Sequence, residues 1–397
     1  MAGGRNRFRG CLTVLWAPRE LYLAVGIGLW LCGYFVVDGW EHRRAVRWLV
    51  PILLLNCDIL VRTMRESRWL WAVAGLLAFQ ALSRWWSVGN EPVSNGFDVL
   101  AVLALLISLV AIGRREDAGN WMLGGLAVLA GGVALFSLAG FYGSEGRHLA
   151  TDRLRNVLIY ENGLNPVLTG MLCGFGAVAA AWFAGREQWV ARRGLWLACL
   201  AVLIFSLMAT QSRGAMLAGG AGLAVLALFL RKAVLPAVVT CAVTVGTYFL
   251  LVARSDADLN LIERGSTGRL EIYHWFLERV SAMEVLIGSG MSADVTIAKV
   301  ELGWFVDHPH SSYLTQFVLT GALGLALLLF VIGWPVLRAL GAARRQEALW
   351  LALLASGAVA VLFDCGQMFS LYSAPRIEFL LVAVPAALCM GRVGAGD

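Results

Sequence analysis

The sequence predicts an all-α polytopic membrane protein, and this prediction rests on its composition and on the lengths of its apolar runs. Of 397 residues, 59% are hydrophobic and only 15% are charged, whereas a soluble domain carries about 25% charged residues. Apolar runs long enough to cross a hydrocarbon core, roughly 20 residues each, recur from near the N-terminus to Met390. We therefore expect residues 1–397 to form a single transmembrane domain.

About twelve runs qualify as candidate spans, and they leave one polar segment, roughly 253–309, much longer than the others. The first run has no small-residue cleavage site behind it, so we expect a retained span and not a signal peptide. The candidate spans cover residues 21–37, 48–61, 69–85, 98–113, 121–142, 164–184, 194–210, 214–230, 233–252, 313–332, 347–363 and 377–390.

The placement of basic residues predicts the orientation of these spans. Eighteen of the 32 Lys and Arg residues lie in the N-terminus, in Arg392 and in alternate loops such as 62–68 and 186–193. Many of the others lie in longer loops, where positive charge says little about orientation. We therefore expect both termini in the cytoplasm and residues 143–163 and 253–309 on the outer face. The net charge of +6 suits a membrane surface better than nucleic acid.

The long polar segment contains an amphipathic pattern in "TGRLEIYHWFLERVSAM", residues 267–283. Leu270, Tyr273, Leu277 and Val280 recur at helical spacing with charged residues between them. This pattern is typical of a helix that lies against a bundle or a membrane surface. We expect short amphipathic helices on the outer face.

Two arginines on this face are candidates for binding an anion. Arg213 lies in the short connection "TQSRGA", where a charge near the hydrocarbon is costly and needs a partner. Pairing with Asp58 or Asp364, or reaching back to the surface, would explain it equally well. Arg269 follows "GST" at the expected start of a helix, where unpaired N–H groups already favour anions. A solvated loop arginine is the plain alternative there.

Other polar residues are harder to interpret. Arg147, Arg153 and Arg155 make a third basic cluster on the outer face. Asn56 and Asp58 interrupt an apolar span, and either a functional role or structural pairing with an arginine would account for them. All eight cysteines lie in or beside apolar runs without a CxxC pair, which favours buried apolar residues.

The histidines predict acid–base chemistry and no metal site. The sequence has no HExxH motif, and the spacing in "HPHSS" fits no standard zinc site. A histidine at a helix start can accept a proton near neutral pH. Pro309 favours extended geometry at His308, so His308→Ala should be mild. We expect His310 to enter the following helix with Ser311 and Ser312, and Gly321 and Gly324 to let that helix pack closely against a neighbour.

These segments resemble the O-antigen ligases and their polymerase relatives. The pattern from His310 through Ser311 to Gly321 and Gly324 is similar to the His-Ser-x9-Gly-x-x-Gly motif of that family. "TQSRGAML", "STGRLEIY" and "VLIGSGM" resemble further family segments in the same order, and the resemblance covers about residues 205–330. "YENGLNPVLTG" at 160–170 resembles the Asn-Pro element of many relatives only loosely.

The resemblance implies a GT-C-type glycosyltransferase of the bacterial inner membrane, with its active site on the periplasmic side. It implies an undecaprenyl-diphosphate-linked glycan as donor, lipid A-core as acceptor and inverting transfer without metal or cofactor. His310 would be the catalytic base, Arg213 and Arg269 would bind the diphosphate, and Arg147, Arg153, Ser311 and the two glycines would support them. An O-antigen polymerase and, less favoured, a lipid-linked sugar flippase stay open as alternatives, and the sequence does not predict the oligomeric state.

Overall fold

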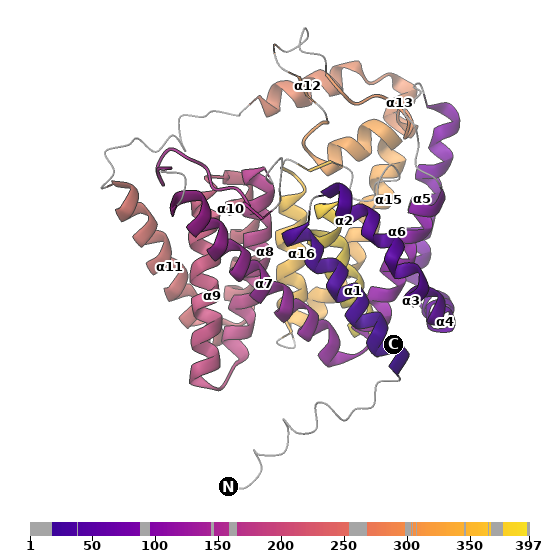
Figure 1. Cartoon of the computed structure of the whole chain (residues 1–397). Coiled ribbons are helices and arrows are strands. Elements are labelled where there is room, and N and C mark those ends of the chain that lie inside the picture. Colours follow the sequence, from indigo (N-terminus) through magenta and orange to yellow (C-terminus); the bar gives the residue numbers. More distant parts are fainter. Residues whose placement is uncertain are drawn as a thin grey trace.

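The computed structural model describes residues 18–394, except 38, 88–95, 144–146, 159–164, 254–267, 298–302, 304, 307, 345–346, 364 and 367–375. Within these residues the chain is helical, apart from loops and one isolated bridge between Ile297 and Val306. The predicted all-α class is therefore confirmed. The helices stand side by side in one bundle, and α12 and α13 lie across one of its ends (Figure 1).

The described residues form the following helices, in chain order. They are α1 (Pro18–Val36), α2 (Gly39–Ala45), η2 (Val46–Leu49), α3 (Val50–Leu55), α4 (Cys57–Glu66), α5 (Arg68–Leu82), η3 (Ser83–Trp86), α6 (Gly96–Gly113), α7 (Glu116–Gly143), α8 (Pro166–Arg186), α9 (Val190–Ala209), α10 (Arg213–Phe229), α11 (Arg231–Ala253), α12 (Arg269–Arg279), α13 (Ala282–Ile287), α15 (Ser312–Ala343), α16 (Leu349–Ala360), the π-helix η4 (Phe379–Ala383) and α17 (Val384–Gly394).

Six of these helices are long and apolar enough to cross a membrane, namely α1, α7, α8, α9, α11 and α15. Shorter apolar helices of 10–17 residues occur at Val46–Leu55, Val99–Gly113, Arg213–Phe229, Leu349–Ala360 and Phe379–Val393. The prediction of one continuous span over 48–61 is wrong, because the chain leaves the helix at Asn56 and α4 begins in a new direction. Asn56 is buried, and its side-chain nitrogen donates to the Ile52 carbonyl, 2.8 Å away.

The centre of the bundle is α8, because 89% of its spanning residues are buried. Small residues allow this burial. A Cβ on Gly174 would lie 3.3 Å from the Cα of Gly219 in α10, so the two backbones come close where both residues are glycine. Close approach of this kind is how helices associate inside a membrane, where lipid tails are as apolar as the side chains.

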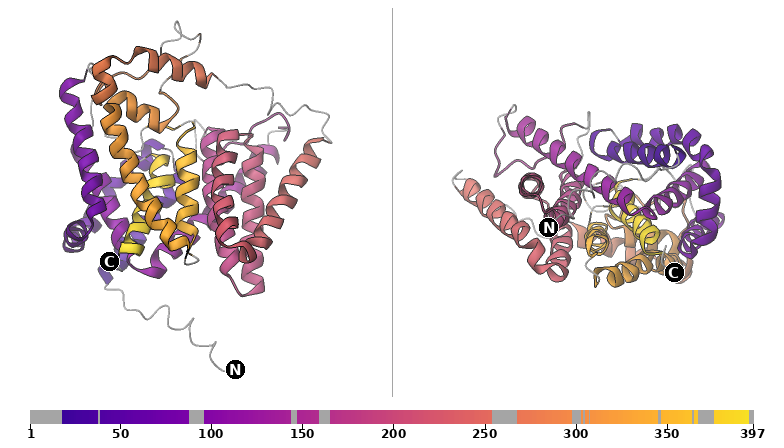
Figure 2. Two further views of the ribbon diagram at one scale, coloured as in Figure 1. Left: turned by 180° about the vertical axis from the view of Figure 1, so that it is seen from behind. Right: turned by 90° about the horizontal axis from the view of Figure 1, so that it is seen from below.

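The two ends of the bundle differ in their chemistry. At one end, where α1 begins and α17 ends, exposed ion pairs join Arg114 to Glu66 and Arg115 to Glu20, 2.6 Å apart in the second pair. The other end carries α12 and α13, the segment that starts α10 and the segment that precedes α15 (Figures 1 and 2). We call this second end the α12 end.

The expected amphipathic helix is present as α12, but its buried face is not the predicted one. Ile272 and Phe276 are buried against Val306 and Val318, whereas Leu270 and Leu277 are exposed. The helix also ends at Arg279, since Val280 is extended and Ser281 starts α13 with a capping box. The capping box satisfies the first N–H groups of α13 and so favours a second, separate helix.

Candidate functional site

Arg213 occupies the first position of α10, directly after a tight turn. The turn contains Gln211, whose φ of 48° lies in the left-handed region that side chains other than glycine seldom adopt. Ser212 caps α10, and its Oγ accepts from the Ala215 N–H at 3.4 Å. Arg213 is exposed at this helix start, where the positive end of the helix dipole adds to the charge of the guanidinium.

A loop from a distant part of the chain holds this turn. Leu154 N donates to the Ala209 carbonyl at 2.9 Å, and Arg153 Nε donates to the Thr210 carbonyl at 3.0 Å. The side-chain nitrogen of Gln211 donates in return to the Ala150 carbonyl at 2.8 Å. Arg153, predicted as a supporting residue, therefore lies on the turn that precedes Arg213.

Arg147, the other predicted member of that loop, lies elsewhere. Its guanidinium carbon sits 4.1 Å above the centre of the Phe141 ring, and the residue is exposed. Arg147 therefore contacts α7 through Phe141.

Arg269 begins α12 after Gly268, which has a φ of 75°. Its guanidinium carbon lies 5.7 Å above the centre of the Phe363 ring, close enough for a cation–π contact. One turn further along α12, the Tyr273 hydroxyl donates to the Leu362 carbonyl at 3.1 Å. The start of α12 is therefore held on the segment that follows α16.

His310 does not enter α15, and this part of the prediction is wrong. Its φ of 54° is left-handed, and the helix begins only at Ser312 with Ser311 as the N-cap. The Ser311 carbonyl accepts from the Thr315 hydroxyl at 2.8 Å, and the Ser312 N–H donates to the Val361 carbonyl at 2.9 Å. His310 thus lies in a turn before the helix, because a left-handed residue cannot continue an α-helix.

The three segments that carry Arg213, Arg269 and His310 meet on Val361–Phe363, which we call the 361–363 turn. Ser312 and the α12 residues contact it as described above. On the third side, a Cβ at Gly214 would lie 2.7 Å from the Phe363 Cβ, so the residue after Arg213 packs directly against this ring. No sequence motif marks the 361–363 turn, which was expected only to end a span. Its one signal was the return of polar residues at Asp364.

The glycines of the predicted motif have two different functions. Gly321 interrupts α15 with a φ of 65°, and the carbonyls of Val318 and Leu319 accept instead from Ser289 N and Gly290 N, both at 2.9 Å. Gly288 packs against the backbone at Leu319, and Gly321 packs against the backbone at Leu286. The segment "VLIGSGM" therefore caps the break in α15.

Gly324 lies next to a pair of buried polar side chains of its own helix. A Cβ there would meet the side chains of Thr320 and Gln316 on its own helix. Gln316 donates to Thr320 Oγ1 at 2.6 Å and accepts from Gln80 of α5 at 2.9 Å. Gly324 thus leaves room for a buried polar link between α15 and α5.

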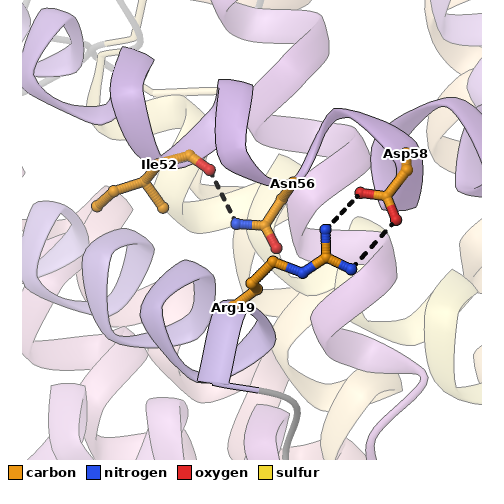
Figure 3. Close-up of polar contacts among 4 residues, drawn as sticks. All are labelled: Arg19, Ile52, Asn56 and Asp58. Carbon is orange, nitrogen blue, oxygen red and sulfur yellow. Dashed lines mark hydrogen bonds and ion pairs between the residues drawn. The ribbon is translucent and has the colours of Figure 1, made fainter.

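Asp58 does not pair with Arg213. Its two carboxylate oxygens lie 3.4 and 3.5 Å from the guanidinium nitrogens of Arg19 (Figure 3). Both side chains are about half exposed, so the pair contributes roughly 0–1 kcal/mol. The pair lies at the end of the bundle opposite α12 (Figure 1), and Asp364 lies outside the described residues.

Among the described residues, no group of three or more His, Cys, Asp or Glu side chains could hold a metal ion. The cysteines at positions 173, 365 and 389 are buried, as expected, but Cys57 is exposed on α4.

A helical bundle with six helices that could cross a membrane defines a polytopic membrane protein. Residues 197–329, about a third of the chain, match the family model described as O-antigen ligase. Members of this family are ligase- or polymerase-type, glycosyltransferase-like enzymes. The matched third of the chain contains Arg213, Arg269, His310, Gly321 and Gly324, and no curated protein matches the sequence.

Proposed function

We propose that this protein is an O-antigen ligase that transfers a glycan from undecaprenyl diphosphate to a sugar hydroxyl of lipid A-core. The observation that carries the proposal is the meeting of three family segments on the 361–363 turn, since donor binding and base catalysis must occur at one place. In this proposal the chain crosses the bacterial inner membrane about twelve times in a GT-C-type fold. Its termini are cytoplasmic, and the α12 end faces the periplasm.

Arg213 and Arg269 bind the diphosphate of the donor. A guanidinium matches phosphate oxygens with two parallel hydrogen bonds and stays charged at any working pH. Both arginines start helices, so the positive dipole ends favour the same anion. This arrangement stabilises the charge that develops on the diphosphate as the glycosidic bond breaks, which is why the proposed reaction needs no divalent metal.

His310 removes the proton from the attacking sugar hydroxyl. Diphosphate is a good leaving group and needs no acid, whereas a sugar hydroxyl is a weak nucleophile that benefits from a base. Such assistance is worth roughly 10² to 10⁴ in rate. Attack opposite the leaving diphosphate inverts the anomeric carbon.

The test uses purified protein in detergent with defined donor and acceptor. Arg213→Lys and Arg269→Lys should lose most transfer activity, because lysine keeps the charge but cannot make two parallel hydrogen bonds to a phosphate. His310→Gln should be slower by at least roughly a hundredfold, because an amide cannot take a proton at neutral pH. Normal turnover by both lysine variants, or by His310→Gln, would refute the corresponding role, and strict Mg²⁺ dependence would contradict the proposed metal independence.

The same superfamily includes polymerases, which use a second polyprenyl-linked glycan as acceptor. Gel analysis of lipopolysaccharide from a deletion strain separates the two activities. A ligase predicts loss of all long chains while the polyprenyl-linked polymer accumulates, whereas a single attached repeat would indicate a polymerase. A flippase would show no transfer at all in the purified system.

A further inference from the structure

The pair His308–His310 has a geometry that the sequence did not predict. The backbone N–H of His310 donates to Nδ1 of His308 at 2.9 Å, and the two ring centres are 4.3 Å apart with the planes tilted by 58°. Nδ1 of His308 must therefore be unprotonated, since a nitrogen that accepts a hydrogen bond carries no proton. Both side chains are half-buried, and Pro309 between them is buried.

This hydrogen bond closes a ring between a side chain and the backbone two residues later. Asparagine and aspartate make the same ring in Asx turns, in which the side-chain oxygen takes the place of a backbone carbonyl. Here the imidazole nitrogen is the acceptor. Pro309 has its own φ fixed near −65°. This restriction reduces the number of backbone conformations from which the hydrogen bond between the two histidines must form.

The hydrogen bond between His308 and His310 matters because His310 adopts an unfavourable backbone conformation. A left-handed conformation is unfavourable for a residue other than glycine, and it persists only where its surroundings enforce it. On the C-terminal side of His310, the Ser312 N–H donates a hydrogen bond to the Val361 carbonyl. On the other side, the described contact is the hydrogen bond to His308.

We propose that His308 is a positioning residue, whose Nδ1 holds the His310 backbone so that the His310 side chain faces the acceptor hydroxyl. This inference rests on the proposed function of His310 as the base. His308 itself transfers no proton. Its loss should lower kcat, because the base is misaligned in the reacting complex, and should leave the KM for the donor nearly unchanged, because both arginines belong to other segments.

Three substitutions at position 308 test this role in the purified transfer assay. His308→Ala removes the acceptor, so in contrast to the mild effect expected from the sequence it should lower kcat by at least about tenfold. His308→Asn places an amide oxygen where an Asx turn needs it and should recover to within about threefold of wild type. His308→Gln is the matched control, because its amide is the same but one methylene longer, and it should stay as slow as His308→Ala.

The outcomes separate this inference from the proposed function. Wild-type kcat in His308→Ala, with His310→Ala inactive, would overturn the positioning role and leave the base intact. Equal loss in the Asn, Gln and Ala variants would also overturn it, because the imidazole would then act through something other than this hydrogen bond. Normal transfer by His310→Ala would refute the proposed function itself. Thermal unfolding of each variant in detergent shows whether it is folded, and the Asn and Gln variants, compared at equal stability, decide the question even if His308→Ala unfolds.

Discussion

Two turns at the α12 end hold a residue other than glycine at positive φ, and they stabilise it in different ways. Among the described residues, Gln211 with a φ of 48° and His310 with a φ of 54° are the two such cases. Gln211 lies two residues before one proposed diphosphate ligand, and His310 is the proposed base. Strained backbone is common at functional sites, where the surrounding structure maintains it.

The turn at Gln211 depends on residues far away in the sequence. Its hydrogen bonds to Ala150 and Arg153 join positions about sixty residues apart. The turn at His310 depends on a side chain only two residues away. Histidine also tolerates the left-handed region better than glutamine does. The comparison teaches that the turn before Arg213 is held by a loop from a distant part of the chain, through Ala150 and Arg153. The His310 turn is held both by its near neighbour His308 and, through Ser312, by Val361.

The largest effect is expected at Phe363, which belongs to the 361–363 turn that both regions contact. Phe363→Ala removes the ring under Arg269 and the surface against which Gly214 packs, so transfer should fall roughly ten- to a hundredfold. Phe363→Tyr keeps the ring and should stay close to wild type. Transfer rates of purified protein provide the measurement. An alanine variant within about twofold of wild type would show that the 361–363 turn does not organise the site.

Substitutions at Gln211 measure the strain in the long-range turn. Gln211→Gly and Gln211→Ala both lose the hydrogen bond to Ala150, worth roughly 0.5–1.5 kcal/mol. Alanine should be the less stable of the two by about 1 kcal/mol, because only glycine adopts positive φ without cost. The unfolding midpoints of the two variants in detergent give this difference directly. Equal midpoints would mean that Gln211 is not strained.

Arg153 should affect the Gln211 turn and not the His310 turn. Arg153→Ala loses the hydrogen bond to the Thr210 carbonyl and should slow transfer about fivefold, equivalent to roughly 1 kcal/mol. In the double variant with Gln211→Gly, the losses of transfer rate should not add, because both residues hold one turn. In the double variant with His308→Ala, the two losses should add. Strong coupling between positions 153 and 308 would contradict the separation of the two turns.

Arg147 provides the smallest expected effect and the control for Arg153. Its guanidinium stacks on Phe141 at an exposed position, and such contacts contribute about 0.5–1 kcal/mol at most. Arg147→Ala should therefore keep transfer within about twofold of wild type. A loss as large as that of Arg153→Ala would place Arg147 in the donor site after all.

Much of the fold was predictable because each membrane-spanning helix corresponds to one continuous apolar run in the sequence. Apolar runs of sufficient length must become helices in lipid, since no other local structure satisfies the backbone there. The prediction was wrong at Asn56, where a buried amide ends one helix and a new one starts. On α12, Ile272 and Phe276 are buried, whereas Leu270 and Leu277 of the predicted apolar stripe are exposed. Spacing on a helix identifies an apolar stripe, but packing against Val306 and Val318 decided which stripe is buried.

The sequence by itself determined the all-α membrane class, the family segments and the candidates Arg213, Arg269 and His310, because each depends on residue type and on spacing along the chain. Only the tertiary structure decided that these segments meet on the 361–363 turn, that Asp58 pairs with Arg19 and that Gly321 breaks α15. Those facts depend on contacts between residues tens to hundreds of positions apart, which no local pattern specifies. The left-handed geometry of His310 was equally hidden, since the sequence gives the two histidines but not the hydrogen bond between them.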